Sequence, residues 1–146
     1  MIPGDRSMLH RVLATLGVMI LAPTASASAQ STTAQSTEPV SNGRALTEWI
    51  ADLKGLSPHT RNAAAYEIAG MGPAAAAAVP ALIEALDDPI AAVRFPVTIA
   101  LLEIGPAAKA AVPRLLAMMD EEINDEIAAS ARRALRHIDP RAVPAR

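Results

Sequence analysis

The sequence lacks cysteine and is poor in aromatic residues, of which it has three among 146: Trp49, Tyr66 and Phe95. Without cysteine the chain forms no disulfide, no thiolate metal site and no lipid-modified cysteine. It has 13 basic and 15 acidic residues, so no excess of positive charge is available for a nucleic-acid partner. The histidines have no ligand or triad partner at a suitable spacing. We therefore expect no metal, no cofactor and no enzymatic activity.

Apolar residues make up 51% of the chain, and most of them are Ala, Leu, Val and Ile. Alanine has the highest helix propensity, and small side chains let helices approach closely. This composition predicts tightly packed helices without large aromatic pockets.

The first 29 residues have the three parts of a secretory signal. Arg6 and Arg11 precede the apolar run 12–22, and small residues lead to a predicted cleavage site after Ala29. The run is too short for a bilayer-spanning helix, which needs about 20 residues. We expect an exported protein, periplasmic or secreted, with no membrane span after cleavage. The polar segment 30–43 lacks periodicity and predicts a disordered linker.

The rest of the chain repeats itself at a period of 33 or 34 residues. Gly72-Pro73 recurs as Gly105-Pro106, and Val79-Pro80 recurs as Val112-Pro113. Apolar residues follow the i, i+3, i+4, i+7 spacing of helices with one buried face. Each period therefore predicts a helix pair, with A helices at 58–71, 91–104 and 125–138 and B helices at about 44–54, 79–87 and 112–121.

The segments 71–86 and 92–116 resemble the HEAT-like repeats of the armadillo-type superfamily, most closely the short bacterial type also found in phycobilisome lyases. The resemblance covers residues 44–144 and implies an all-α, short right-handed α-solenoid of about two and a half helix pairs, occupying 44–146. Such repeats serve many proteins as recognition surfaces, so the resemblance specifies the fold and not an activity.

Two departures from a regular array stand out. Pro96 falls inside the second A helix, where it should kink or delay that helix. The final A helix lacks a following B helix, so we expect modest stability or self-association through this incomplete C-terminal end.

Arginines recur in the A helices and also cluster in the last one. Arg61 and Arg94 occupy equivalent positions, and we expect them to pair with acids of the preceding link, such as Asp87 or Asp88 for Arg94. A further three, at 132, 133 and 136, form a basic ridge. A carboxylate or phosphate site is conceivable there, but a solvated face is the preferred interpretation because the chain is acidic overall.

In HEAT-like stacks the B helices line the concave, partner-contacting face, and the resemblance implies the same here. The outward B positions predict a protein-binding surface made of Glu48, Asp52, Glu84, Arg114 and an exposed Met118. The sequence thus predicts an exported, non-catalytic scaffold or adaptor for an unidentified protein. The alternatives are a bilin lyase or isomerase-like protein, suggested by the repeat resemblance alone, and a purely structural spacer of the cell envelope.

Overall fold

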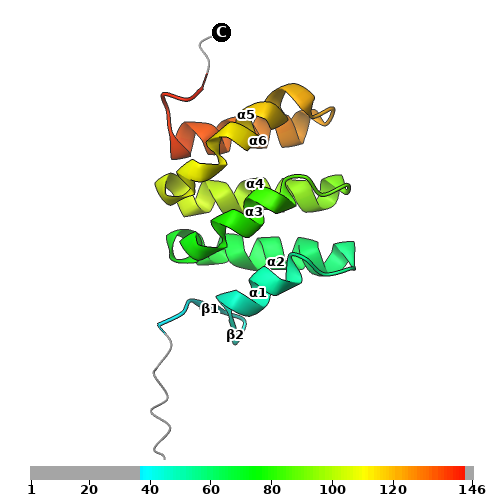
Figure 1. The fold of residues 1–146 in the computed structure, drawn as a ribbon, viewed down its shortest axis with the longest axis vertical. Coiled ribbons are helices and arrows are strands. Elements are labelled where there is room, and N and C mark those ends of the chain that lie inside the picture. The colour runs from blue at the N-terminus through cyan, green and yellow to red at the C-terminus, as the bar shows by residue number, and fades with distance from the viewer. Residues whose placement is uncertain (1–36, 144–146) are drawn as a thin grey trace, which may run out of the picture. The chain divides into compact units, whose positions relative to one another are not determined.

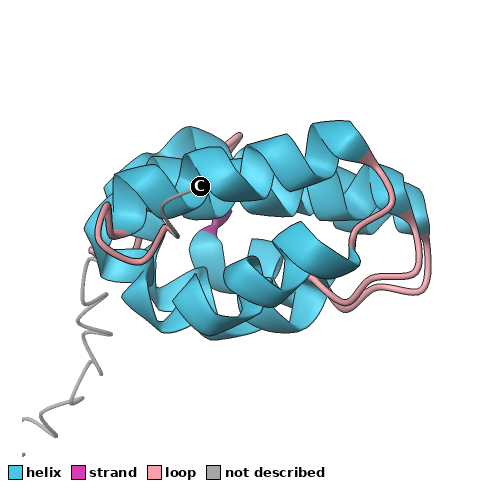
Figure 2. Ribbon diagram, turned by 90° about the horizontal axis from the view of Figure 1, so that it is seen from above, coloured by secondary structure: helices cyan, strands magenta, loops and turns pink. Residues whose placement is uncertain are grey.

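The computed structural model describes residues 37–143, in which six α-helices form two layers (Figures 1 and 2). One layer holds α2 (Pro58–Met71), α4 (Ala91–Ile104) and α6 (Asp125–Ile138). The other holds α1 (Leu46–Asp52), α3 (Val79–Ala85) and α5 (Val112–Glu121). The predicted A and B helices are confirmed, as is the all-α solenoid fold. The B helices α1 and α3 are a few residues shorter than expected.

Each A helix is joined to the next B helix by a 3₁₀ segment, Gly72–Ala78 after α2 and Gly105–Ala111 after α4. Gly72 and Gly105 have positive φ angles of 56° and 71°, which residues with a Cβ atom rarely adopt. The repeated Gly-Pro pair therefore fixes where the A helix ends and the chain turns back. By length and composition alone, the continuous stretches Pro58–Ala85 and Ala91–Glu121 could cross a membrane, but each bends at its glycine.

The core lies between the two layers and consists almost entirely of aliphatic side chains. Neighbouring A helices pack side by side, α2 on α4 and α4 on α6, and each B helix packs against its A partner. The largest fully buried side chains come from both layers: Leu46, Ile68, Leu82, Leu86, Leu101, Ile104, Leu115, Met118, Ile127 and Leu135. Because every repeat contributes to one continuous core, removing a repeat would expose the faces of its neighbours.

Pro96 lies inside α4 without delaying the start of the helix at Ala91. Proline has no N–H, so the carbonyl of Ala92, four residues earlier, loses its usual helical donor. The side-chain Nδ2 of Asn62 in α2 donates to this carbonyl at 2.5 Å. Of the predicted kink or delay, the delay is therefore wrong, and the neighbouring A helix supplies the hydrogen bond that Pro96 removes.

A short β-hairpin, β1 (Val40–Ser41) paired with β2 (Arg44–Ala45), covers the N-terminal end of the stack. Asn42 and Gly43 form its two-residue turn with φ angles of 50° and 75°, as in a type I′ turn. Ser41 Oγ and Asn42 Nδ2 each donate to Glu67 at 2.6 Å, and the indole of Trp49 donates to the Ser41 carbonyl at 3.2 Å. The prediction of a disordered linker is therefore wrong for residues 37–43. The rest of that linker and the predicted signal, 1–29, lie outside the described residues.

A candidate protein-binding groove between two links

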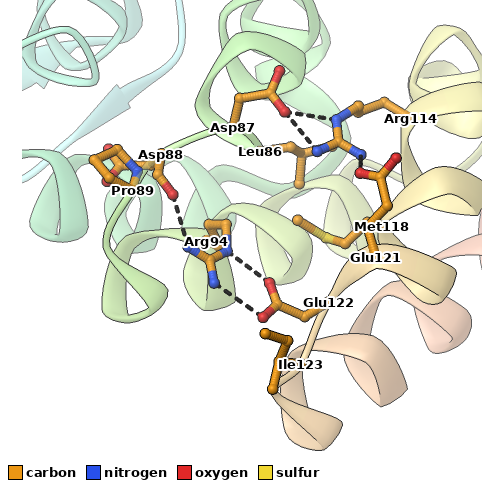
Figure 3. A pocket seen from close by; sticks show the side chains of 10 residues that line it. All are labelled: Leu86, Asp87, Asp88, Pro89, Arg94, Arg114, Met118, Glu121, Glu122 and Ile123. Carbon is orange, nitrogen blue, oxygen red and sulfur yellow. Dashed lines mark hydrogen bonds and ion pairs between the residues drawn. The ribbon is translucent and has the colours of Figure 1, made fainter.

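A depression of about 340 Å³ lies between the link that joins α3 to α4 and the link that joins α5 to α6 (Figure 3). We call it the inter-link groove. Its lining comes from the two links, the first turn of α4 and residues along α5: Leu86, Asp87, Asp88, Pro89, Arg94, Arg114, Met118, Glu121, Glu122 and Ile123.

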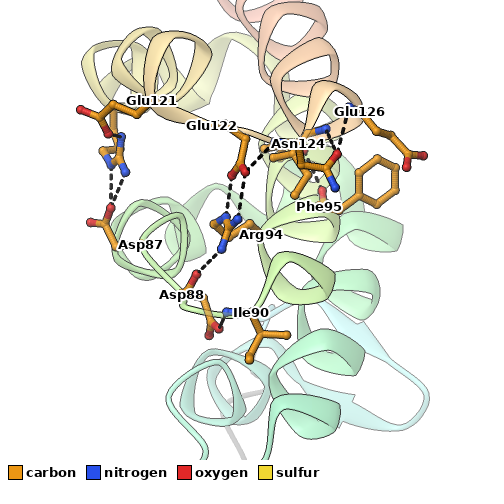
Figure 4. Close-up of polar contacts among 12 residues, drawn as sticks. Asp87, Asp88, Ile90, Arg94, Phe95, Glu121, Glu122, Asn124 and Glu126 are labelled. Atoms are coloured by element: carbon orange, nitrogen blue, oxygen red, sulfur yellow. Dashed lines mark hydrogen bonds and ion pairs between the residues drawn. The ribbon is translucent and has the colours of Figure 1, made fainter.

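The wall of the groove is built on Arg94, which joins the two links (Figure 4). Its Nε and Nη2 donate to the two carboxylate oxygens of Glu122 at 2.7 and 3.0 Å. Its Nη1 donates to the backbone carbonyl of Asp88 at 2.8 Å. This bidentate arrangement holds the α5–α6 link against the α3–α4 link.

Arg61 makes the equivalent contacts one repeat earlier. It bonds the carboxylate of Asp88 at 2.5 and 3.1 Å and the carbonyl of Gly55 at 2.9 Å. The prediction that Arg94 pairs with an acid of the preceding link is therefore wrong. The Asp88 carboxylate is already engaged by Arg61, so the preceding link offers Arg94 only its carbonyl, and the following link supplies the acid.

Each of the two links carries a carboxyl group whose pKa is lowered, Asp88 in one and Glu122 in the other. Burial raises the pKa of Asp88, but the hydrogen bonds from Arg61 and from the Ile90 amide outweigh burial and hold this pKa below its ordinary value. Hydrogen bonds from Arg94 lower the pKa of Glu122 against the opposing effect of burial. Both side chains therefore stay ionised at neutral pH and bind the links together.

The outer rim of the groove carries a second, exposed set of ion pairs centred on Arg114. Its guanidinium contacts Asp87 Oδ1 at 2.6 and 2.7 Å and Glu121 Oε2 at 3.1 Å. These carboxylates raise the pKa of Arg114. Among the described residues, no group donates to the second oxygen of either carboxylate. The rim therefore keeps two free acceptors that face solvent.

Apolar side chains complete the groove. Ile123 is 95% exposed, and the exposed Pro89 lies on the opposite link. Leu86 and Met118 lie beneath them, and Met118 is only 2% exposed. The prediction of an exposed Met118 is wrong. The B helices α3 and α5 pack against their A partners and also against the 3₁₀ segment Gly105–Ala111. Their buried arc is therefore wider than the i, i+3, i+4, i+7 stripe and also covers the equivalent Ala85.

A family model for HEAT repeats matches residues 46–136, which is more than half of the chain. The chain belongs to the HEAT repeat family. A search of curated proteins finds no match. HEAT repeats suggest a scaffold of the protein-interaction kind, and the two layers, the repeated links and the bent 3₁₀ connections all belong to this repeat architecture.

The HEAT repeats distribute the five predicted contact residues over separate places. Glu48 and Asp52 both face Arg44, with their carboxylates 3.4 and 2.7 Å from its guanidinium. Glu84 pairs with Lys54 at 2.7 Å, across the boundary between the first two repeats. Of the five, the inter-link groove brings together only Arg114 and Met118. Glu84 also lines an adjoining depression together with Asp87 and Asp88 of the groove, and the binding role of the five residues stays a prediction.

Of the residues that line this groove, the sequence prediction named only Arg114 and Met118 as contact residues, and it missed the rest, among them Asp87, Glu121 and Ile123. The repeat alignment places Leu56, Pro89 and Ile123 at equivalent link positions, so every link carries an apolar side chain just before its A helix. This recurring apolar position, together with the acidic residues at 87–88 and 121–122, is the sequence pattern that indicates the groove. Within residues 37–143, no three His, Asp or Glu side chains gather where they could hold a metal ion.

Proposed function

We propose that this HEAT repeat protein is a non-catalytic adaptor that binds another protein in the inter-link groove. The observation that carries the proposal is Ile123, an aliphatic side chain that is 95% exposed at the mouth of a groove of about 340 Å³. An exposed apolar side chain contributes nothing to the core. Next to a groove with a polar rim, it is the arrangement expected of a contact surface.

The charges of the groove favour a cationic partner segment. Its lining contains four carboxylates, those of Asp87, Asp88, Glu121 and Glu122, and two guanidinium groups, which leaves a formal charge of −2. The outer oxygens of Asp87 and Glu121 accept no bond from described residues. We infer that the partner offers a lysine or arginine to this rim and an apolar side chain to Ile123 and Pro89.

The proposal includes export. Its support is the sequence pattern of residues 1–29, which has a basic start, an apolar run and small residues before Gln30. The test is amino-terminal sequencing of the protein recovered from cells and medium. A chain that begins at Gln30 in the periplasm or medium supports export, and an intact chain in the cytoplasm contradicts it.

The experiment that tests binding is affinity capture with the native protein and two groove variants, Ile123→Asp and Asp87→Lys. The matched control is Leu56→Asp, because Leu56 is equally exposed in the first link but lies outside the groove. We expect a partner that the native protein and the control retain and that both groove variants lose. Equal capture by all four proteins, or capture by none, would refute the groove and favour the spacer interpretation.

A further inference from the structure

The arginines of the described region divide into two groups according to their partners. Four of them, Arg44, Arg61, Arg94 and Arg114, each form an ion pair with Asp or Glu. Four others form no ion pair with any described residue: Arg132, Arg133, Arg136 and Arg141. Both lysines of this region, Lys54 and Lys109, are also within 4 Å of a carboxylate. The cations without a partner therefore gather at one corner, formed by the C-terminal half of α6 and the turn after it.

This corner contains a depression of about 340 Å³ between α4 and α6. Its lining residues are Leu102 and Glu103 from α4 and Arg133, Arg136 and His137 from α6. Arg133 and Arg136 are three positions apart, so their side chains neighbour each other on the helix surface. We call this depression the α4–α6 basic pocket.

The imidazole of His137, an exposed residue, lies against Gly105. Gly105 follows α4, and a Cβ atom at that position would lie 3.3 Å from His137 Nε2. The absence of a side chain at residue 105 thus makes room for the imidazole beside the two guanidinium groups.

The helix dipole does not account for this cluster. Basic residues in a last turn stabilise the negative end of a helix, which would explain Arg136 and His137. However, α2 and α4 end without any basic residue in their last turns. Arg132 and Arg133 lie further from the end of α6, where the effect of the dipole has faded.

We propose that the α4–α6 basic pocket binds a phosphate group. Its lining carries the guanidinium groups of Arg133 and Arg136 and the carboxylate of Glu103, so its formal charge is +1 in a chain whose total is −2. A phosphate offers separate oxygens to the two guanidinium groups, whereas a carboxylate has only two oxygens to share between them. The phosphate oxygens also match guanidinium groups in bidentate geometry and leave an acceptor for the imidazole.

The phosphate can come from a small phosphate ester or from a phospholipid headgroup, and both present the same chemistry to the pocket. Neither source depends on the inter-link groove. The proposal therefore stands or falls separately from the proposed function.

The test titrates the full chain with inorganic phosphate and follows the dissociation constant by NMR chemical shifts. Acetate at equal ionic strength is the control for non-specific charge effects. We expect phosphate to bind at least about tenfold more tightly than acetate, a difference of about 1.4 kcal/mol. Arg133→Gln combined with Arg136→Gln should abolish that preference. Circular dichroism of each variant confirms that it remains folded.

Two further variants separate a binding site from a structural role. Glu103→Gln removes the repelling carboxylate and should tighten phosphate binding several-fold, which a merely solvated surface would not do. Ile123→Asp lies in the inter-link groove and should leave phosphate binding unchanged. Vesicles of anionic phospholipid form the second arm, in which much tighter binding than to inorganic phosphate identifies a lipid headgroup and equal binding identifies a soluble phosphate. Equal affinity for phosphate and acetate, or no effect of the arginine and glutamate variants, would overturn the proposal.

Discussion

Replacing Met118 by alanine tests whether the floor of the inter-link groove belongs to the core. The side chain is 2% exposed, so its removal leaves a cavity between α5 and its neighbours. Truncation of a buried methionine to alanine costs about 2–5 kcal/mol. Because Met118 lines the groove, water can enter part of the cavity, and we expect a loss near the lower end, about 2–3 kcal/mol.

The assay is urea unfolding followed by far-UV circular dichroism, which reports loss of helix directly. The matched control is Met119→Ala, since Met119 has the same chemistry in the next position but is only partly buried. Met118→Ala should lower the free energy of unfolding clearly more than the control does. A loss below about 0.5 kcal/mol, typical of exposed positions, would show that Met118 is a surface residue and that the described packing is wrong.

Three further outcomes follow from the links and the A helices. The pKa values of Asp88 and Glu122 lie below the ordinary 3.8 and 4.5, so the stability that their ionised forms contribute is fully present above pH 5. This stability is lost as the pH falls through 4 and below. The free energy of unfolding of an Asp88→Asn, Glu122→Gln double variant should therefore depend less on pH than that of the native protein. Asn62→Ala should lower the free energy of unfolding by about 1 kcal/mol in the native chain. In a Pro96→Ala background the loss should be smaller, because the restored N–H of residue 96 donates to the Ala92 carbonyl in place of Asn62. A double-mutant cycle of urea unfolding measures the difference. Gly72→Ala should cost about 1–3 kcal/mol by the same assay because of its positive φ angle, and an unchanged stability would contradict this backbone geometry.

Periodicity in the sequence predicted the helices well because each repeat shows its pattern several times. The ends of the A helices at Met71 and Ile104 were marked by Gly-Pro pairs, and the start of α6 by Asn124, whose side chain accepts from the amides of Glu126 and Ile127. In these places a local rule acts alone, so sequence is sufficient.

Contacts between repeats were harder to predict. Arg61, one repeat earlier, already binds the carboxylate of Asp88 in the link that precedes Arg94. Arg94 therefore pairs with Glu122 of the following link, which its own repeat does not reveal. Met118 is likewise buried where Leu86 and Arg94 of the preceding repeat line the same groove, and its own helix does not reveal this. The polar composition of residues 30–43 predicts disorder, whereas the Asn42-Gly43 pair within it favours the two-residue turn of the hairpin.

The central claim, that the inter-link groove contacts a partner protein, is tested most directly by site-specific photo-cross-linking in the source cell. A cross-linking side chain is placed at Ile123 in one variant and at Leu56 in another, both fully accessible link positions. The claim predicts a discrete adduct from position 123 that is absent from position 56 and lost when Asp87→Lys is added. No adduct from position 123, or the same adduct from both positions, would contradict it.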